Sequence, residues 1–490
     1  MSNGNFYRLF ENNLRNPSAI VLGLETGECH SREWLHQLSG RYAEALRRHG
    51  CAAGDRIAVQ LDKSAHVFAL YLACLRAGFC YLPMNTAYRA AELAYLLEDA
   101  RPAVFFRSTS AEEIPADIVP STTKVFTFGP KGEGNFAPSV EAADGTFSTV
   151  AVQEGDPAAL LYTSGTTGRP KGAVLSHRAL SYSAQTLAAL WGFSSQDVLL
   201  HTLPIFHSHG LFISFNVALV SGARLLLRSK FDAADAIEAL SQSTVFMGVP
   251  TFYHRLLALP SLTKDACRNV RLFVSGSAPL SADVHREFEA RTGQRILERY
   301  GSTEAMILCS NPLDGERRPG SVGLPIPGVD LRIAGQADQA LPVGSIGMIQ
   351  ARGPGLFSGY WNKPDQTREE FTADGFFRTG DLGRVDDKGY VSITGRAKDL
   401  IISGGYNVYP AEVEAVIDEM SSVREKAVVE VRPIPTSASA WLPSSFPQTK
   451  VIRPPPPKSS SASRIAWPTI RFQSKSLSWT HCRAIPWAKC

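Results

Sequence analysis

Thr163-Ser-Gly-Thr-Thr-Gly-Arg-Pro-Lys-Gly172 is the stretch that decides how this sequence is interpreted. It follows an apolar, strand-like run, Ala-Ala-Leu-Leu-Tyr162, and precedes another that begins at Ala173. Glycines let backbone N–H groups approach a phosphate closely, while hydroxyl side chains and Lys171 add donors and positive charge. The spacing is not that of a Walker loop. We interpret the stretch as a phosphate-binding loop; the alternative is a hairpin turn of small residues.

The sequence around this loop alternates strand-like and helix-like segments. Helical spacing predicts helices over residues 31–48, 65–78 and 90–99. The strand-like run over residues 55–60 predicts a strand. This rhythm predicts an α/β fold with a parallel sheet. Residues 128–157 read as a loop, and residues 340–395 contain short β-like runs between Gly, Pro and Asp turns. A further helix is predicted from Pro410.

Composition excludes several classes of protein. The chain has 490 residues, 44% of them hydrophobic and 20% charged, as in a soluble protein with more than one domain. We find no secretory signal and no apolar run long enough to span a membrane, and the eight cysteines show no CxxC pairing. A cytoplasmic protein without a nucleic-acid or membrane partner is therefore expected.

The net charge of +4 hides an uneven distribution. Glu430 is the last acidic residue, and the 59 residues from Arg432 to Cys490 hold nine Lys/Arg and four of the seven tryptophans. Residues 1–431 therefore carry −5. Such a basic, Pro- and Ser-rich tail is typical of disorder, although clustered tryptophan is not.

Five motifs in order resemble the acyl-adenylate-forming superfamily, which includes acyl-CoA synthetases, luciferases and adenylation domains. After the loop come Tyr300-Gly-Ser-Thr-Glu304, Arg378-Thr-Gly-Asp381, Gly395-Arg-Ala-Lys-Asp399 and a segment beginning Ser403-Gly-Gly-Tyr. The resemblance covers residues 1–430. It implies a large, multi-subdomain N-terminal domain and a small α+β C-terminal domain, here truncated. We expect boundaries at 1–395, at 396–431 for the hinge and the start of the small domain, and at 432–490 for the tail.

The resemblance also implies the roles of individual residues in ATP-dependent adenylation. Charge at the phosphates must be neutralised when a carboxylate attacks ATP. Lys171 suits the β- and γ-phosphates, Thr303 a phosphate, and Glu304 Mg²⁺. Tyr300 would stack on adenine, Asp381 would accept from the ribose with Arg396 nearby, and Lys398 stands at the hinge. The expected ATP-binding residues are Thr163, Ser164, Gly165, Thr166, Thr167, Gly168, Lys171, Ser277, Ala278, Pro279, Tyr300, Gly301, Thr303, Asp381 and Arg396; those expected to be catalytic are Lys171, His207, Thr303 and Glu304.

Two segments bear on the acid that is activated. Arg299 precedes Tyr300, and a second carboxylate on the substrate would need such a two-pronged cationic partner. We expect His207 to add a donor; the alternative is that one histidine of the pair His207 and His209 packs in the core, and we do not favour a metal site there. The surrounding segments resemble malonyl-CoA synthetases, which implies malonate and coenzyme A as substrates. Ser302 departs from the methionine expected there.

The resemblance stops after Val431, and the coding frame offers a reason. When the third base of each codon is read with the next two bases, residues 479–489 can encode Asp-Ala-Leu-Pro-Arg-Asn-Thr-Met-Gly-Lys, with the Asp, Leu and Gly forced. The superfamily is expected to carry Pro-Arg-Asn-x-x-Gly-Lys, whose Lys is needed for adenylation. We interpret the tail as out of frame through loss of one base or gain of two. The alternative is a genuine basic tail that binds an acidic partner.

The expected function is therefore ATP-dependent ligation of malonate to coenzyme A through a malonyl-adenylate, impaired here by loss of that Lys. Two alternatives stay open: a CoA ligase for another small acid, such as methylmalonate or a short fatty acid, and a nucleotide-binding remnant without turnover.

Overall fold

The computed structural model describes residues 3–163, 169–403, 406–408, 410, 428–431, 448–451, 470–472 and 475–477. The chain divides into two compact units. The large unit holds Met1–Leu331 and Ala351–Thr379, and the small unit holds Arg332–Gln350 and Gly380–Cys490. The helix predicted from Pro410 lies, apart from that residue, outside the described residues, as does most of the tail.

A six-stranded sheet of the large unit has the order β6-β5-β3-β4-β7-β8. Strands β3, β4, β5, β6 and β7 pair in parallel, and β8 runs antiparallel to β7. The parallel sheet expected from the sequence is confirmed. The strands are β3 Arg56–Gln60, β4 Cys80–Pro83, β5 Val104–Ser108, β6 Lys124–Phe128, β7 Pro157–Thr163 and β8 Lys171–Ser176.

A nine-stranded sheet of the same unit has the order β15-β14-β13-β12-β11-β9-β10-β1-β2. Its central strands pair in parallel, so their carboxyl ends meet at one edge, where ligands of α/β folds commonly bind. The strands are β1 Ile20–Gly23, β2 Cys29–Ser31, β9 Val198–His201, β10 Arg224–Leu227, β11 Val245–Gly248, β12 Leu272–Ser275, β13 Ile296–Tyr300, β14 Cys309–Ser310 and β15 Leu324–Pro325.

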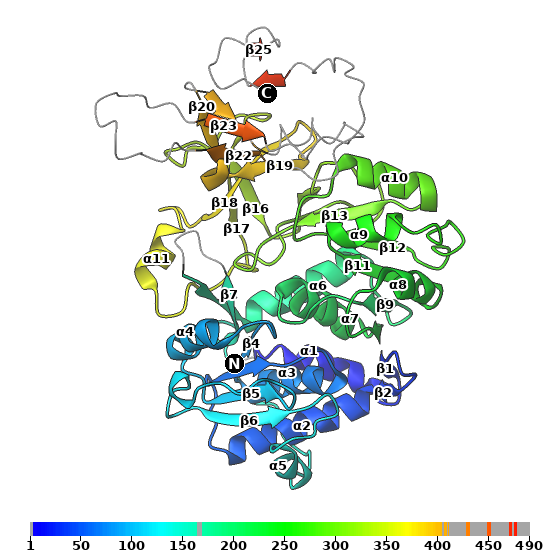
Figure 1. Cartoon of the computed structure of the whole chain (residues 1–490), viewed down its shortest axis with the longest axis vertical. Coiled ribbons are helices and arrows are strands. Elements are labelled where there is room, and N and C mark those ends of the chain that lie inside the picture. The colour runs from blue at the N-terminus through cyan, green and yellow to red at the C-terminus, as the bar shows by residue number, and fades with distance from the viewer. Residues whose placement is uncertain are drawn as a thin grey trace, which may run out of the picture. The chain divides into compact units, whose positions relative to one another are not determined.

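Helices surround both sheets (Figure 1). They are α1 Tyr7–Glu11, α2 Arg32–Arg48, α3 Ala65–Ala77, α4 Ala90–Ala100, α5 Ala137–Glu141, α6 His177–Leu190, α7 Asn216–Ser221, α8 Ala233–Ala239, α9 Pro250–Leu257, α10 Ala282–Thr292 and α11 Pro364–Glu369, with 3₁₀ turns η1 Asn12–Arg15, η2 Ala116–Ile118, η4 Leu240–Gln242 and η5 Ala397–Asp399 and a π-helix, η3 His209–Phe215. No helix in the described part of the chain has both the length and the apolar character that crossing a bilayer requires.

Local signals explain several helix ends. The Ser31 hydroxyl accepts from the Trp34 N–H at the start of α2, and the Ser64 hydroxyl from the Val67 N–H at the start of α3. Gly78 ends α3 in the left-handed region, at φ 71°. The three helices predicted near the N-terminus are therefore confirmed. The predicted loop 128–157 contains the short helix α5.

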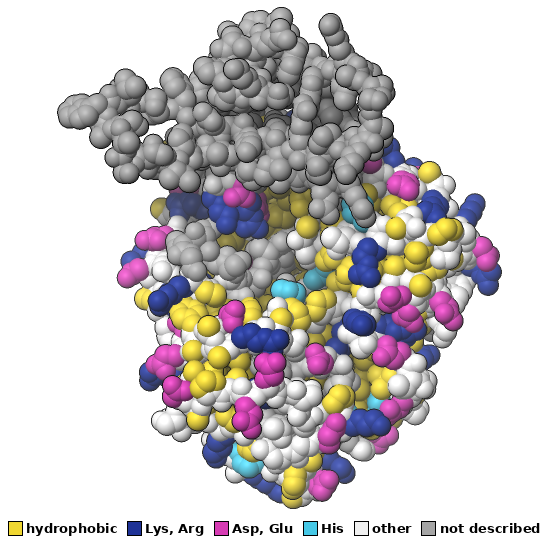
Figure 2. All heavy atoms as spheres, viewed as in Figure 1, with side chains coloured by type: hydrophobic (Ala, Val, Ile, Leu, Met, Phe, Trp, Pro, Cys, Tyr) yellow, Lys and Arg dark blue, Asp and Glu magenta, His cyan; other side chains and the backbone are white. Residues whose placement is uncertain are grey.

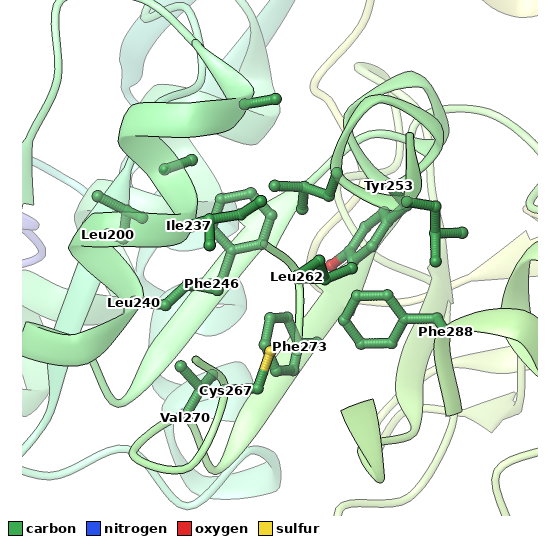
Figure 3. Close-up of a cluster of buried hydrophobic side chains, with 14 of the residues drawn as sticks. Leu200, Ile237, Leu240, Phe246, Tyr253, Leu262, Cys267, Val270, Phe273 and Phe288 are labelled. Atoms are coloured by element: carbon green, nitrogen blue, oxygen red, sulfur yellow. The ribbon is translucent and has the colours of Figure 1, made fainter. Parts of the chain in front are cut away.

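The core between the nine-stranded sheet and helices α8, α9 and α10 is apolar and aromatic (Figure 3). The rings of Phe246, Phe273 and Phe288 lie fully buried in it, with ring centroids about 5–6 Å apart in successive pairs. The Tyr253 hydroxyl donates to the Val274 carbonyl at 2.8 Å, so its burial leaves no unpaired donor. This packing fixes β12 and β13, which carry the candidate site, against α8, α9 and α10.

The other strands among the described residues form a four-stranded sheet, in the order β16-β17-β18-β19, and three two-stranded antiparallel sheets. The β-like runs predicted near 348–352 and 390–394 are β17 and β19. The strands are β16 Asp330–Ala334, β17 Gly347–Arg352, β18 Phe377–Val385, β19 Val391–Arg396, β20 Ile401–Ser403, β21 Tyr406–Val408, β22 Val428–Val431, β23 Gln448–Val451, β24 Ile470–Phe472 and β25 Lys475–Leu477.

Candidate active site

The predicted phosphate loop joins two antiparallel strands. Thr163 ends β7, Lys171 begins β8, and the two residues are register partners. The loop residues Ser164, Gly165, Thr166, Thr167 and Gly168 lie outside the described residues. The two strands that it joins are thus antiparallel neighbours, and their facing ends bring Thr163 and Lys171 side by side.

Lys171 is buried and already paired. Its side chain is 7% exposed, and its ammonium lies 3.0 Å from an oxygen of Glu370, just beyond α11. The same ammonium stands 4.3 Å from the centre of the Tyr360 ring, a cation–π contact. The cation is therefore held from two directions by residues nearly 200 positions away in sequence.

Glu304 shares this cluster. One of its carboxylate oxygens accepts from the Thr163 hydroxyl at 3.2 Å and from the Tyr360 hydroxyl at 3.1 Å. Burial raises the pKa of Tyr360, and the negative charges of Glu304 and Glu370 raise it further, so the phenol stays protonated and donates. Thr303 precedes Glu304 in the same turn and is half-buried.

The described residues bring together no group of three or more His, Cys, Asp or Glu able to hold a metal ion. A carboxylate such as Glu304 still fits Mg²⁺, because Mg²⁺ in nucleotide sites commonly takes one or two carboxylates, substrate phosphates and water.

Arg299 lies on β13 with almost no access to solvent. Its side chain makes no ion pair with a described residue, and its Nε and Nη2 have no hydrogen-bond partner there. Burial lowers its pKa to about 10, so it stays charged at neutral pH. Gly276, just after β12, lies against it: a Cβ at Gly276 would stand 2.4 Å from the Arg299 Cζ.

The histidine beside Arg299 is His209 rather than His207. His209 begins the π-helix η3, is buried, and its Nδ1 lies 3.3 Å from the Ser277 hydroxyl. Burial, followed by the charge of Arg299, holds the His209 pKa well below its ordinary value, so the ring is uncharged. Its Nε2 has no partner among the described residues. His207 is exposed.

The residues expected around adenine lie at the carboxyl ends of β12 and β13. Tyr300 is buried at the end of β13, while Ser277, Ala278 and Pro279 are exposed after β12. Ser277 has φ 72°, a left-handed conformation that non-glycine residues adopt only under strain. Gly301 has no room for a side chain, because a Cβ there would stand 1.8 Å from the Met306 carbonyl oxygen.

Asp381 and Arg396 belong to the small unit. They are register partners on β18 and β19, and the Arg396 Nε lies 2.9 Å from an Asp381 oxygen. Lys398 lies in the 3₁₀ turn η5 that follows. The two residues, which the sequence only placed near one another, thus form an ion pair within the small unit.

The family is decided by comparison with known proteins. Residues 9–361 match the AMP-binding enzyme family. The chain belongs to the AMP-binding enzyme family. A malonate–CoA ligase of Arabidopsis thaliana is 34% identical over 414 residues, covering 80% of this chain and 68% of that protein. An indoleacetate–CoA ligase of Aromatoleum aromaticum is 35% identical over 405 residues, covering 80% and 79%.

Solved structures agree. ATP-bound MatB from Rhodopseudomonas palustris matches with a TM-score of 0.86 and 46% identity, covering 88% of this chain and 86% of that chain. The resemblance and the fold class expected from the sequence are confirmed. The chain is an AMP-forming acid–CoA ligase of this family, whose CoA ligases use ATP and coenzyme A.

Several residues of the cluster were not singled out from the sequence. Glu370 and Tyr360 meet Lys171 only through the fold, and Gly276 matters only because Arg299 lies against it. The adjacent Glu298 and Arg299 were a usable signal. Charged residues are rarely buried, so two of them in succession in a strand of a buried sheet indicate a functional or structural role for each.

Proposed function

We propose that this chain is built to ligate malonate to coenzyme A through a malonyl-adenylate, with Arg299 binding the distal carboxylate. The observation that carries the proposal is a buried guanidinium whose Nε and Nη2 are unpaired among the described residues. A fixed two-pronged donor matches a carboxylate, and leaving such a group buried and unpaired is unfavourable.

The neighbouring groups support a small dianionic acid. The uncharged His209 offers an Nε2 without a partner among the described residues, and its Nδ1 lies 3.3 Å from the Ser277 hydroxyl. Charged and neutral donors together would compensate a desolvated carboxylate, whereas the methyl end of a fatty acid would leave all of them unpaired. The similarity to a malonate–CoA ligase and to MatB agrees with this assignment.

For the nucleotide, we propose that Lys171 and the hydroxyls of the loop neutralise the β- and γ-phosphates, with Thr303. When bound, Mg²⁺ would screen the phosphate charge, and Glu304 is the residue proposed to hold it. Tyr300 and residues 277–279 would enclose adenine, Asp381 and Arg396 would serve the ribose, and Lys398 would be the hinge. The division into 1–395, 396–431 and 432–490 remains part of this proposal.

Binding of different acids tests the assignment. Isothermal titration calorimetry with malonate, methylmalonate and butyrate in the presence of MgATP should show malonate bound most tightly. Arg299→Met should weaken malonate by at least about 30-fold, because one partner of a buried charge pair is removed. Arg295→Met removes the same charge from an exposed residue paired with Glu289 and should leave malonate binding unchanged. Equal affinity for butyrate, or no effect of Arg299→Met, would remove the dicarboxylate assignment.

The second part of the proposal is that adenylation is impaired in this chain. The Lys expected in Pro-Arg-Asn-x-x-Gly-Lys is absent from the frame that encodes residues 432–490. Malonate-dependent ATP–pyrophosphate exchange should therefore be slower by about 100-fold or more than in a chain whose gene has one base restored near codon 431. Equal rates for the two chains would contradict the impairment, and the failure of the restored frame to stay open would contradict the frameshift.

A further inference from the structure

The cation of the phosphate loop has an anionic partner within its own chain. The Lys171 ammonium lies 3.0 Å from Glu370, with side chains 7% and 29% exposed. A lysine that must meet a polyphosphate is thus already neutralised by a carboxylate, at the distance that a phosphate oxygen would take.

The two neighbours of Lys171 are attached to the fold differently. Tyr360 is fixed: its hydroxyl donates to Glu304, its N–H donates to Thr367, and the neighbouring Gly359 accepts from Val174 of β8. Its ring therefore keeps its place beneath the ammonium whatever else binds. Glu370 follows the six-residue helix α11 and is the more exposed partner, so its carboxylate is the one that can be displaced.

We propose that Glu370 is an internal counter-ion that holds Lys171 ready for the nucleotide and is displaced by the terminal phosphates of MgATP. This rests on the proposed function, in which Lys171 binds those phosphates. Two anions cannot share one ammonium in a partly buried site without strong repulsion, so phosphate and Glu370 exclude each other. Tyr360 retains the cation during the exchange.

The exchange has a consequence for selectivity. The apparent affinity of a ligand is its intrinsic affinity multiplied by the fraction of protein whose site is open, and the Lys171–Glu370 pair lowers that fraction. A triphosphate that reaches Lys171 bears this cost, whereas AMP, which lacks the terminal phosphates, does not. Removing the Glu370 charge should therefore favour MgATP selectively.

The test is the affinity of Glu370→Gln for MgATP and for AMP, measured by calorimetry at fixed ionic strength. MgATP should bind Glu370→Gln about three- to tenfold more tightly than it binds the unchanged chain. AMP should bind the two proteins with affinities that agree within about twofold. Glu369→Gln makes the same charge change one residue earlier, on an exposed side chain, and should alter neither affinity. Unchanged or weaker MgATP binding by Glu370→Gln, or equal tightening for AMP or by Glu369→Gln, would overturn the proposal.

Lys171→Met separates this proposal from the one on which it rests. If Lys171 binds the terminal phosphates, Lys171→Met should weaken MgATP by roughly tenfold or more. No weakening would refute the role of Lys171 itself. Weakening by Lys171→Met, with no tightening by Glu370→Gln, would refute the counter-ion role of Glu370 alone. Thermal unfolding of each variant shows whether the fold is retained.

Discussion

Glu298 gives the sharpest prediction of stability. Its side chain on β13 is 6% exposed, one carboxyl oxygen accepts from the backbone N–H groups of Leu280 and Gly320, and the other has no partner among the described residues. Burial outweighs these two hydrogen bonds and raises the pKa of Glu298 from 4.5 to about 8. The folded protein therefore holds a neutral carboxylic acid at neutral pH.

The raised pKa fixes the sign and the size of a pH effect. Between pH 4.5 and about 8 the unfolded chain has lost a proton that the folded protein retains, so Glu298 makes stability fall as pH rises through this window. One pKa unit corresponds to about 1.36 kcal/mol, which gives a loss of roughly 4–5 kcal/mol over the window as an upper bound. Above pH 8 the effect is constant.

Glu298→Gln removes this titration while keeping the shape of the side chain and an oxygen for the Leu280 N–H. The free energy of unfolding, measured by urea denaturation, should be compared between the variant and the unchanged chain. The difference in favour of the variant should increase by several kcal/mol from pH 5 to pH 8. Glu287→Gln, on the exposed face of α10, should follow the unchanged chain throughout. The reasoning is wrong if Glu298→Gln and the unchanged chain show the same pH dependence.

Two further substitutions test packing and charge. Gly276→Ala places a Cβ 2.4 Å from the Arg299 guanidinium, which must move, so the Kd for malonate should rise by about tenfold while the urea midpoint changes little; an unchanged Kd would contradict this. Asp197→Asn leaves Arg271 without the buried carboxylate that it contacts at 2.8 Å, and should lower the free energy of unfolding at pH 7 by about 1–3 kcal/mol. Burial opposes ionisation of Asp197, but Arg271 and the surrounding donors lower its pKa below 3.8. The stability that the ionised carboxylate contributes should therefore begin to fall as the pH drops below about 3.8. A loss of unfolding free energy for Asp197→Asn that is as large at pH 3 as at pH 7 would refute this.

The early part of the fold was predictable because its signals are local. Helix α2 begins at a serine that caps it and ends in two arginines, and α3 ends at a glycine, so spacing and caps agree on both. The surface of the large unit mixes charges of both signs with apolar side chains (Figure 2), as the moderate composition of the body suggested. The tail, predicted to be out of frame or disordered, lies mostly outside the described residues.

The site was predictable only where its residues are neighbours in sequence. Lys171 meets Glu370 across 199 positions, and Thr163 meets Glu304 across 141, so no spacing along the chain could reveal either contact. The choice between His207 and His209 depended on a π-helix that begins at His209, and a 3.6-residue period does not anticipate which side chain such a helix buries. Long-range contacts and local irregularity thus set the limit.

The two cations of the site are kept in opposite states, and this difference has a physical reason. Lys171 is paired with Glu370, whereas Arg299 is buried with Nε and Nη2 unpaired among the described residues. MgATP contacts its enzyme at many points and arrives with part of its charge screened by a divalent ion, so displacing one carboxylate costs little of its total affinity.

A small dicarboxylate has few contacts to offer. Its binding must draw on relief of an unfavourable buried charge, and an internal counter-ion at Arg299 would remove that driving force. We therefore expect that a carboxylate introduced beside Arg299, as in Gly276→Asp, would abolish malonate binding, whereas the carboxylate beside Lys171 lowers MgATP affinity only severalfold.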